Sequence, residues 1–253
     1  MMNTTRDRTR GFTLIEIVII VAVMAILAAA ITPAVLQQVM DAKVTSTKTS
    51  AKALYEAIAG RPDTKGNFGF LGDMGRFPTT LEELIKPAAG TPLFDTRGTF
   101  RGVGVGWKGP YISVGETREG FLVDGWGRAF TMAPDGRVHS AGPDGVVGND
   151  DDIVYPPEPT RVGSRVMVTL KRESSVGDGQ TVDPIGYEVR LYYAKNGQEA
   201  FLASITPPYT FENVHPGLHA VAVFRLNSNQ VVAQDTLEVL PNSTKLVEMF
   251  FHP

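Results

Sequence analysis

The chain has no cysteine among its 253 residues, which excludes disulfide bonds, thiolate nucleophiles and cysteine-based zinc sites. It also lacks a strong excess of charge: the formal net charge is −3, so no basic surface for nucleic acid is predicted. Histidine is scarce, with four residues, and none stands at metal-ligand spacing beside Asp or Glu. The length allows one large domain or two small ones with a tail.

Motifs for catalysis are lacking as well. No G-x-S-x-G, Walker A or H-E-x-x-H pattern is present. Residues 104–109 do spell G-x-G-x-x-G, but a dinucleotide fingerprint needs a helix after it, and Pro110-Tyr111 opens no helical pattern. We therefore predict that the chain is not an enzyme.

One long apolar run dominates the N-terminus. It follows a leader that contains Arg6, Arg8 and Arg10, and the twenty residues from Ile17 to Leu36 carry no charge. At a rise of about 1.5 Å per residue, such a helix spans the roughly 30 Å hydrocarbon core of a bilayer. The basic flank predicts a cytoplasmic N-terminus.

The helical pattern continues beyond this run. Apolar or small residues recur every three or four positions along one helix face: Leu36, Met40, Val44, Thr47, Ala51, Leu54 and Ile58. We predict a helix over residues 12–59, kinked at Pro33 and ended by Gly60 and Pro62. A cleaved signal peptide ending near residues 28–30, which would release a soluble exported protein, does not explain this continuation.

Glu16 is the one ionisable residue at the start of the apolar run. A carboxylate in lipid is costly unless it is protonated or paired with a cation. A cut between Gly11 and Phe12 would create an α-amino group one helical turn away, and the same amine on a neighbouring chain is an equally available partner.

The segment RGFTLIEIVIIVAVMAILAAAITPAV resembles the N-terminal signature of type IV prepilins and type II secretion pseudopilins. The resemblance implies that a prepilin peptidase cuts after Gly11 and methylates the amine of Phe12. It also implies that Glu16 guides subunits into a filament by pairing with a neighbour's N-terminus.

Four later segments resemble, in the right order, motifs of the type II major pseudopilin family: DMGRFPTTLEEL, WKGPYI, DGWGRAF and SAGPDGVVGNDDDI. Gly125 and Ala129 depart from the family pattern, which has proline at both positions. Thr79 and Thr80 each precede a glutamate by three residues, which predicts a capping box that opens a short helix before Pro87.

The last of these segments is an acidic loop, residues 140–153. Its side chains Asp144, Asn149, Asp150, Asp151 and Asp152 offer oxygen ligands of the kind that Ca²⁺ prefers. The residues alone leave a solvated acidic turn equally open. The family resemblance implies a structural Ca²⁺ held by Asp144, Asp152 and either Asp150 or Asp151, with the carbonyls of Ser140 and Ala141 as further candidates.

The C-terminal part has a different sequence pattern. Short β-rich runs, several of which alternate apolar and polar residues, are separated by turn signals such as Asn196-Gly197 and Pro216-Gly217. Six or seven strands over about ninety residues predict a small β-sandwich. YTFENVHPGLHAVAV resembles transthyretin-like or carboxypeptidase-regulatory-like modules.

We therefore predict an α+β fold, with a long N-terminal helix, a small pseudopilin β-sheet head and a separate all-β sandwich, which is an extra module relative to the family that the chain resembles. The predicted parts are a leader (1–11), a membrane and filament-core helix (12–59), a head (60–155), a Pro-rich linker (156–160) and the sandwich (161–253).

The predicted function is that of a structural subunit in the periplasmic filament of a type II secretion system. The chain would be anchored in the bacterial inner membrane by its single helix, with its bulk in the periplasm. Its partners would be further copies, other pseudopilins, inner-membrane secretion proteins and the prepilin peptidase. A type IV pilus minor pilin with an adhesin-like C-terminal module is the alternative.

Overall fold

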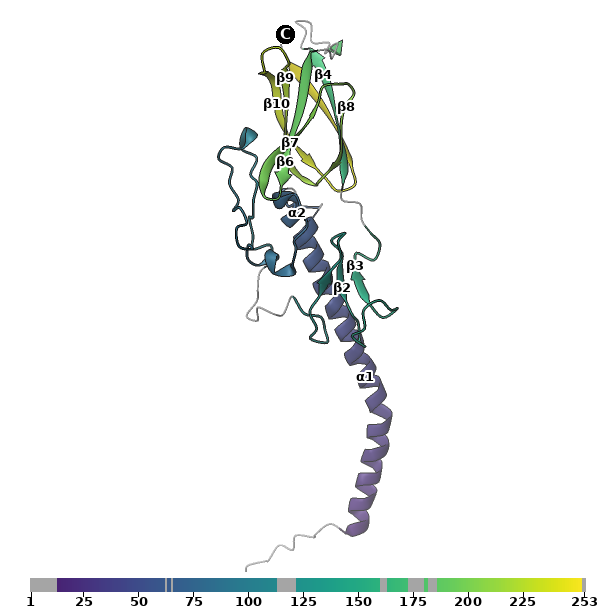
Figure 1. Cartoon of the computed structure of the whole chain (residues 1–253). Helices are drawn as coiled ribbons and strands as arrows, with labels where there is room; N and C mark the ends of the chain where they lie inside the picture. Colours follow the sequence, from purple (N-terminus) through teal and green to yellow (C-terminus); the bar gives the residue numbers. More distant parts are fainter. Residues whose placement is uncertain are drawn as a thin grey trace, which may run out of the picture. The chain divides into compact units, whose positions relative to one another are not determined.

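The computed structural model describes residues 13–61, 63–64, 66–112, 122–159, 163–172, 180–181 and 186–251. The chain divides into two compact units, residues 1–45 and 46–253, which we describe separately. Helix α1, Leu14–Ala59, begins in the first unit and ends in the second (Figure 1). Its helical assignment continues through Pro33. The predicted long helix is confirmed from Leu14 onward, and Phe12 lies outside the described residues.

In the first unit the helix carries an apolar surface that is exposed within the single chain. Leu14, Met24 and Ile26 are each more than 60% exposed, and every described side chain through Asp41 is classed as exposed. By length and composition, the helix is able to cross a membrane. It is the one such helix in the part of the chain that the structure describes.

In the second unit the predicted helical stripe faces a core. Thr47, Ala51, Leu54 and Ile58 are completely buried, whereas Leu36 and Met40 of the first unit are exposed. The buried positions contribute to the head core, which also contains the following residues: Phe70, Met74, Leu81, Leu84, Ile112, Phe130 and Val138. The 3.6-residue period therefore predicted the packed face correctly.

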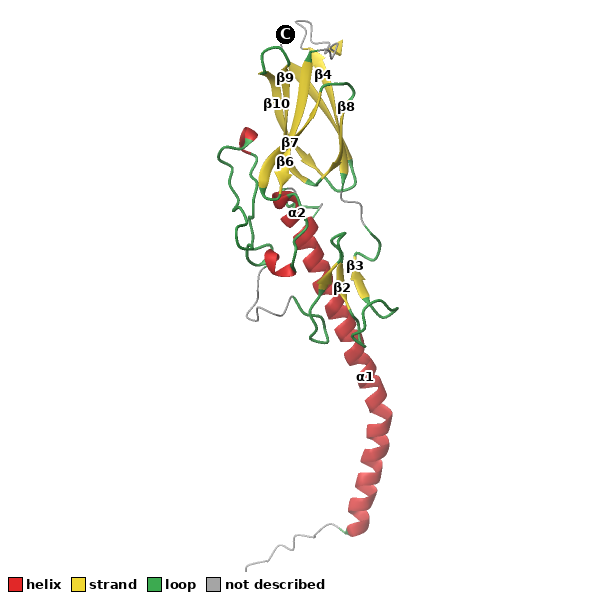
Figure 2. Ribbon diagram, viewed as in Figure 1, coloured by secondary structure: helices red, strands yellow, loops and turns green. Residues whose placement is uncertain are grey.

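The head around this core contains little regular structure. Its elements are α2 (Gly69–Met74), the 3₁₀ turns Leu81–Leu84 and Phe100–Gly102, and strands β1 (Thr131–Met132), β2 (Val138–Ser140) and β3 (Ile153–Tyr155) (Figure 2). The three strands form an antiparallel sheet in the order β1-β2-β3. This agrees with the small β-sheet head that the sequence predicts.

The predicted capping box, Thr79 with Glu82 or Thr80 with Glu83, is replaced by a different contact. Thr80 precedes the 3₁₀ turn Leu81–Leu84 and makes no side-chain cap hydrogen bond. Instead, the carboxylate of Glu83 accepts a 3.0 Å hydrogen bond from the backbone N–H of Thr79 and pairs with Arg76 at 2.7 Å. The tertiary ion pair to Arg76 holds Glu83, so the local threonine signal did not decide the geometry.

The C-terminal part forms a β-sandwich of eight strands, slightly more than predicted because β5 is a two-residue strand. These strands are β4 (Ser164–Arg172), β5 (Gln180–Thr181), β6 (Tyr187–Lys195), β7 (Gln198–Ser204), β8 (Tyr209–Val214), β9 (Gly217–Arg225), β10 (Gln230–Val239) and β11 (Thr244–Phe251). One sheet has the order β10-β9-β6-β7; the other has the order β11-β4-β5, with β8 also pairing with β4.

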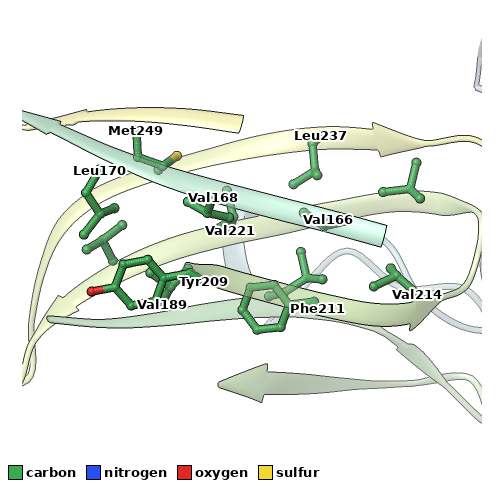
Figure 3. Close-up of a cluster of buried hydrophobic side chains, with 13 residues drawn as sticks. Val166, Val168, Leu170, Val189, Tyr209, Phe211, Val214, Val221, Leu237 and Met249 are labelled. Carbon is green, nitrogen blue, oxygen red and sulfur yellow. The ribbon is translucent and has the colours of Figure 1, made fainter. Parts of the chain in front are cut away.

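Alternating side chains from the two sheets fill the sandwich core (Figure 3). Val166, Val168 and Leu170 of β4 face Val221 and Val223 of β9, all of them 3% exposed or less. The predicted turn at Asn196-Gly197 joins β6 to β7, and both of its residues have the positive φ of a tight hairpin turn.

Candidate assembly and metal sites

The start of α1 is closed by a reciprocal pair of hydrogen bonds between Thr13 and Glu16. The backbone N–H of Thr13 donates to Glu16 Oε2 at 3.4 Å, and the backbone N–H of Glu16 donates to Thr13 Oγ1 at 3.3 Å. The carbonyl of Thr13 accepts the first helical bond, from Ile17, so Thr13 is the N-cap residue. This is a capping box, and the T-x-x-E spacing that signals it is visible in the sequence.

The capping box directs the carboxylate of Glu16 toward the beginning of the helix. The partially positive N-terminal end of a helix favours an anion there. Both Thr13 and Glu16 are exposed within the single chain, so the carboxylate is open to a neighbouring group. Gly11 and Phe12, the predicted processing site, lie outside the described residues.

The acidic loop between β2 and β3 is organised by its own carboxylates. Asp144 accepts hydrogen bonds from the backbone N–H of Val146 at 2.7 Å and from the side-chain amide of Asn149 at 2.8 Å. Asp152 accepts from the backbone N–H of Gly148 at 2.7 Å. Asp150 is exposed. The loop is therefore a series of tight turns stabilised by side-chain acceptors.

Two oxygens in this loop have no hydrogen-bond partner among the residues that the structure describes. Oδ1 of Asp151 and Oδ1 of Asp152 are buried without a hydrogen bond. Buried carboxylate oxygens normally bind a donor or a cation, so this pair fits a hard metal ion. Among the described residues, however, no three Asp, Glu, His or Cys side chains come together as a metal cluster. A cation here would need backbone carbonyls for much of its coordination.

Of the predicted carbonyl ligands, Ala141 accepts a backbone hydrogen bond from Gly145 at 3.0 Å. Ser140 is buried, and its side chain bonds to Asp124 of the neighbouring hairpin. Both residues lie at the start of the loop, on the same turn as Gly142, which packs directly under Asp151. The structure thus brings the start of the loop close to one of the orphan carboxylates.

Arg128 is a loop-binding residue that the sequence reasoning missed. Its guanidinium donates hydrogen bonds to the carbonyl of Gly142 and, at 3.1 Å, to that of Pro143. A Cβ atom at Gly145 would lie 2.7 Å from its Cζ, so the guanidinium fills the space beneath the loop. No sequence signal pointed to this role, since a hairpin arginine is ordinarily solvent-facing.

The same hairpin is attached to α1. The backbone N–H of Gly125 donates a 2.8 Å hydrogen bond to Oγ1 of Thr47, which is completely buried. The predicted hairpin at residues 124–130 is confirmed by the antiparallel bridge between Val123 and Ala129. Helix, hairpin and acidic loop are therefore joined by a continuous set of hydrogen bonds.

Comparison with known proteins agrees with these features. Residues 6–32 match the prokaryotic N-terminal methylation motif. Type II secretion system core protein G of Pseudomonas aeruginosa is 30% identical over 159 residues, which cover 92% of that protein and 58% of this chain. The proteins of the same name from Escherichia coli and Dickeya chrysanthemi are 26% and 29% identical and are covered to 90% and 85%.

The aligned share of 58% is too short to contain the helix, the head and the sandwich together. Part of this chain therefore has no counterpart in these relatives, in agreement with the extra C-terminal module predicted from the sequence. The methylation motif, the long apolar helix and the coverage of nearly the whole of core protein G carry the assignment. The chain is a pseudopilin that belongs to the type II secretion system core protein G family.

Proposed function

We propose that this pseudopilin is cut by a prepilin peptidase between Gly11 and Phe12, methylated at Phe12, and polymerised with further copies and other pseudopilins. The helix would hold the unassembled subunit in the bacterial inner membrane as a single span, with the remainder in the periplasm. The proposed role is mechanical: the filament helps to move proteins outward, and the chain itself catalyses no reaction. The observation that carries this proposal is the Thr13–Glu16 capping box at the start of an exposed apolar helix.

The proposal assigns the assembly step to Glu16. A carboxylate within a membrane is costly, and pairing with a cation offsets that cost. The residues from Ile17 to Leu36 offer no Lys or Arg for this purpose. The methylated amine at Phe12 of an adjacent copy would supply the charge, so each new subunit is drawn to the end of the filament by an unpaired acid.

The experiment compares polymerisation of the wild type with that of Glu16→Ala and Glu16→Gln in cells that overproduce the other secretion components. We expect both variants to insert into the membrane and to be processed, but to form few or no filaments in cross-linking and electron microscopy. Asp41→Ala is the matched control, since Asp41 is an exposed acid on the same helix. Normal filaments from Glu16→Ala would refute the assembly role.

Mass spectrometry of the mature N-terminus tests the processing step independently. We expect the mature chain to begin with methylated Phe12. A chain that begins after the alanines at residues 28–30 would instead identify a cleaved signal peptide. Thr13→Val adds a further comparison, because it removes the hydroxyl of the capping box and leaves the charge of Glu16 unchanged.

We further propose that the acidic loop binds a structural Ca²⁺. The two buried, unbonded oxygens of Asp151 and Asp152 support this proposal. Asp144 and the carbonyls of Ser140 and Ala141 are the further ligands that the family resemblance implies, and backbone oxygens would supply much of the six to eight that Ca²⁺ needs. When bound, the ion would offset the mutual repulsion of the carboxylates and stabilise the loop.

A further inference from the structure

The central strands β6 and β9 of the sheet β10-β9-β6-β7 carry buried side chains on both faces, which is unusual for an antiparallel sheet at the outside of a sandwich. Leu191, Val221 and Val223 point into the sandwich core. The alternate positions point the other way, yet they too are apolar and buried: Tyr192, Ala220, Ala222 and Phe224, between 0% and 9% exposed. Other residues must therefore pack on this second face and exclude water from it.

The cover comes from the head. Phe100 and Val103, from the long connection between α2 and β1, form one apolar cluster with these four side chains. The rings of Phe100 and Tyr192 are stacked at 4.3 Å with an interplanar angle of 5°. Val103 is 3% exposed. Removing this apolar surface from water stabilises the contact.

Hydrogen bonds fix the position of the contact. The backbone N–H of Phe100 donates to Oε1 of Glu199 on β7 at 2.6 Å. The backbone N–H of Gly197, in the β6–β7 turn, donates to the carbonyl of Met74 at the end of α2 at 2.8 Å. These bonds specify one register, which apolar packing alone does not do.

Close backbone approach adds a further constraint at the end of α2. Gly75 has φ +65° and lies directly against the carbonyl of Ala194 on β6, so a Cβ there would collide with it. The β8–β9 turn reaches the same helix, since a Cβ on Gly217 would lie 3.3 Å from the carbonyl oxygen of Gly72. Two separate segments of the sandwich therefore contact α2, in addition to the contact with Phe100 and Val103.

The glycine-rich run Gly102–Gly109, which mimics a nucleotide-binding motif, has a place in this contact. Gly104 packs against the ring of Phe94, and Gly106 packs against the backbone of Leu93. Backbone hydrogen bonds join Asp95 to Val105 in both directions. The absence of Cβ atoms lets the two arms of the loop lie close together, so that the loop presents Phe100 and Val103 from its tip.

We propose that residues 94–107 form a docking strap that fixes the C-terminal sandwich to the pseudopilin head. The sandwich is then an integral part of every subunit, held at one position on the filament, and not a module that swings on the Pro-rich linker. The partner that the outer face of the β10-β9-β6-β7 sheet recognises is the strap of its own chain. This inference goes beyond filament assembly and does not depend on processing or on calcium.

The experiment places a site-specific protease sequence within residues 156–160 of the full-length protein in detergent. After cleavage the covalent linker is gone, and only the strap and the contacts at the end of α2 join the two parts. We expect the two fragments to remain together in gel filtration at micromolar concentration. Separation of the wild-type fragments under these conditions would overturn the proposal.

Variants locate the contact. Val103→Asp places a charge in the apolar cluster and should release the sandwich after cleavage, and Phe100→Ala should weaken the association at least tenfold. Leu93→Asp is the matched control, because Leu93 lies just before the strap and is 65% exposed; it should leave the association unchanged. Circular dichroism before cleavage checks that each variant is folded. If Val103→Asp does not fold, Phe100→Ala alone tests the contribution of the strap. If Phe100→Ala keeps wild-type affinity, the strap does not hold the sandwich.

Discussion

The hydroxyl of Ser140 donates a 2.7 Å hydrogen bond to Oδ2 of Asp124, and both side chains are buried. Oδ1 of the same carboxylate accepts 2.9 Å hydrogen bonds from the backbone N–H groups of Trp126 and Arg128. One carboxylate therefore shapes the hairpin and attaches it to the first residue of the acidic loop. Ser140 in turn accepts from the N–H of Gly142 at 3.2 Å, which extends the connection into the loop.

Asp124→Ala should destabilise the head strongly. The substitution leaves the buried hydroxyl of Ser140 without its acceptor, at about 1–3 kcal/mol, and two partly buried backbone N–H groups without theirs, at a smaller cost. We expect a loss of about 2–4 kcal/mol in the free energy of unfolding, measured as a fall in Tm of the full chain. Asp135→Ala is the control, because Asp135 pairs with Arg137 near the surface and should contribute less than about 1 kcal/mol. Equal shifts in both variants would contradict the role of Asp124.

Asp73→Asn should stabilise the protein at neutral pH. Burial raises the pKa of Asp73 to about 6, against the opposing charge of Lys108 and the hydrogen bond from the hydroxyl of Tyr111. An acid whose folded pKa is raised favours folding when it is protonated, and this contribution is lost as the pH rises through about 6. The asparagine variant should therefore gain about 1–3 kcal/mol above about pH 7 and little near pH 4.

The measurement is the difference in Tm between Asp73→Asn and the wild type as a function of pH. The amide oxygen of asparagine still accepts the hydrogen bond from Tyr111, so the variant changes charge more than packing. Asp63→Asn, at an exposed position, should show no such dependence. A difference in Tm that does not change between about pH 4 and pH 7.5 would exclude the raised pKa.

His219 should make the folded state sensitive to acid. Its side chain is 2% exposed, burial lowers its pKa to about 4, and one ring nitrogen is bonded to the carbonyl of His215 at 2.8 Å. The unfolded chain binds the proton near the ordinary pKa of about 6.5. As the pH falls from about 7 toward 4, the unfolded state takes up protons first and stability is lost.

His219→Gln should flatten this part of the pH profile. At about pH 5 the histidine costs roughly 2 kcal/mol of stability relative to neutral pH, a loss that glutamine does not undergo. Chemical denaturation at several pH values measures the effect. Burial also lowers the pKa of His215, so the double variant should flatten the profile further. An unchanged slope in both variants would show that neither imidazole is kept neutral by burial.

Calcium should raise the Tm of the full-length protein, and chelation by EDTA should lower it. A ligand at about one hundred times its Kd stabilises the folded state by about 2.7 kcal/mol. The double variant Asp151→Asn/Asp152→Asn should lose this response, because amides replace the two orphan carboxylates. Asp135→Asn should keep it. If the wild-type Tm is the same in calcium and in EDTA, the loop is an acidic turn that needs no metal.

Local patterns in the sequence predicted much of this fold. The period of Thr47, Ala51, Leu54 and Ile58 identified the buried helix face, because a helix repeats its faces regardless of what covers them. Strand alternation and the Asn196-Gly197 turn predicted the β-sandwich in the same way. The capping box at Thr13 and Glu16 is equally local, because its T-x-x-E spacing lies within one helical turn.

Contacts between segments that are distant in the chain could not be predicted from the sequence. Arg128 binds the acidic loop through carbonyls that are 14 and 15 positions away, and backbone acceptors leave no residue-type signal. The G-x-G-x-x-G run has the spacing of a nucleotide-binding motif, but its glycines pack against Leu93 and Phe94. This packing depends on how the whole loop is folded.

The sequence by itself determined the long apolar helix, the position of Glu16, the order of the pseudopilin motifs and the class of the C-terminal module. Each of these rests on spacing within one continuous segment. Only the tertiary structure decided that the sandwich lies on the head through Phe100 and Val103, and that Asp151 and Asp152 each keep a buried oxygen without a donor. The reason is that burial and hydrogen-bond satisfaction are properties of neighbours in space, and the sequence does not state which distant residues become neighbours.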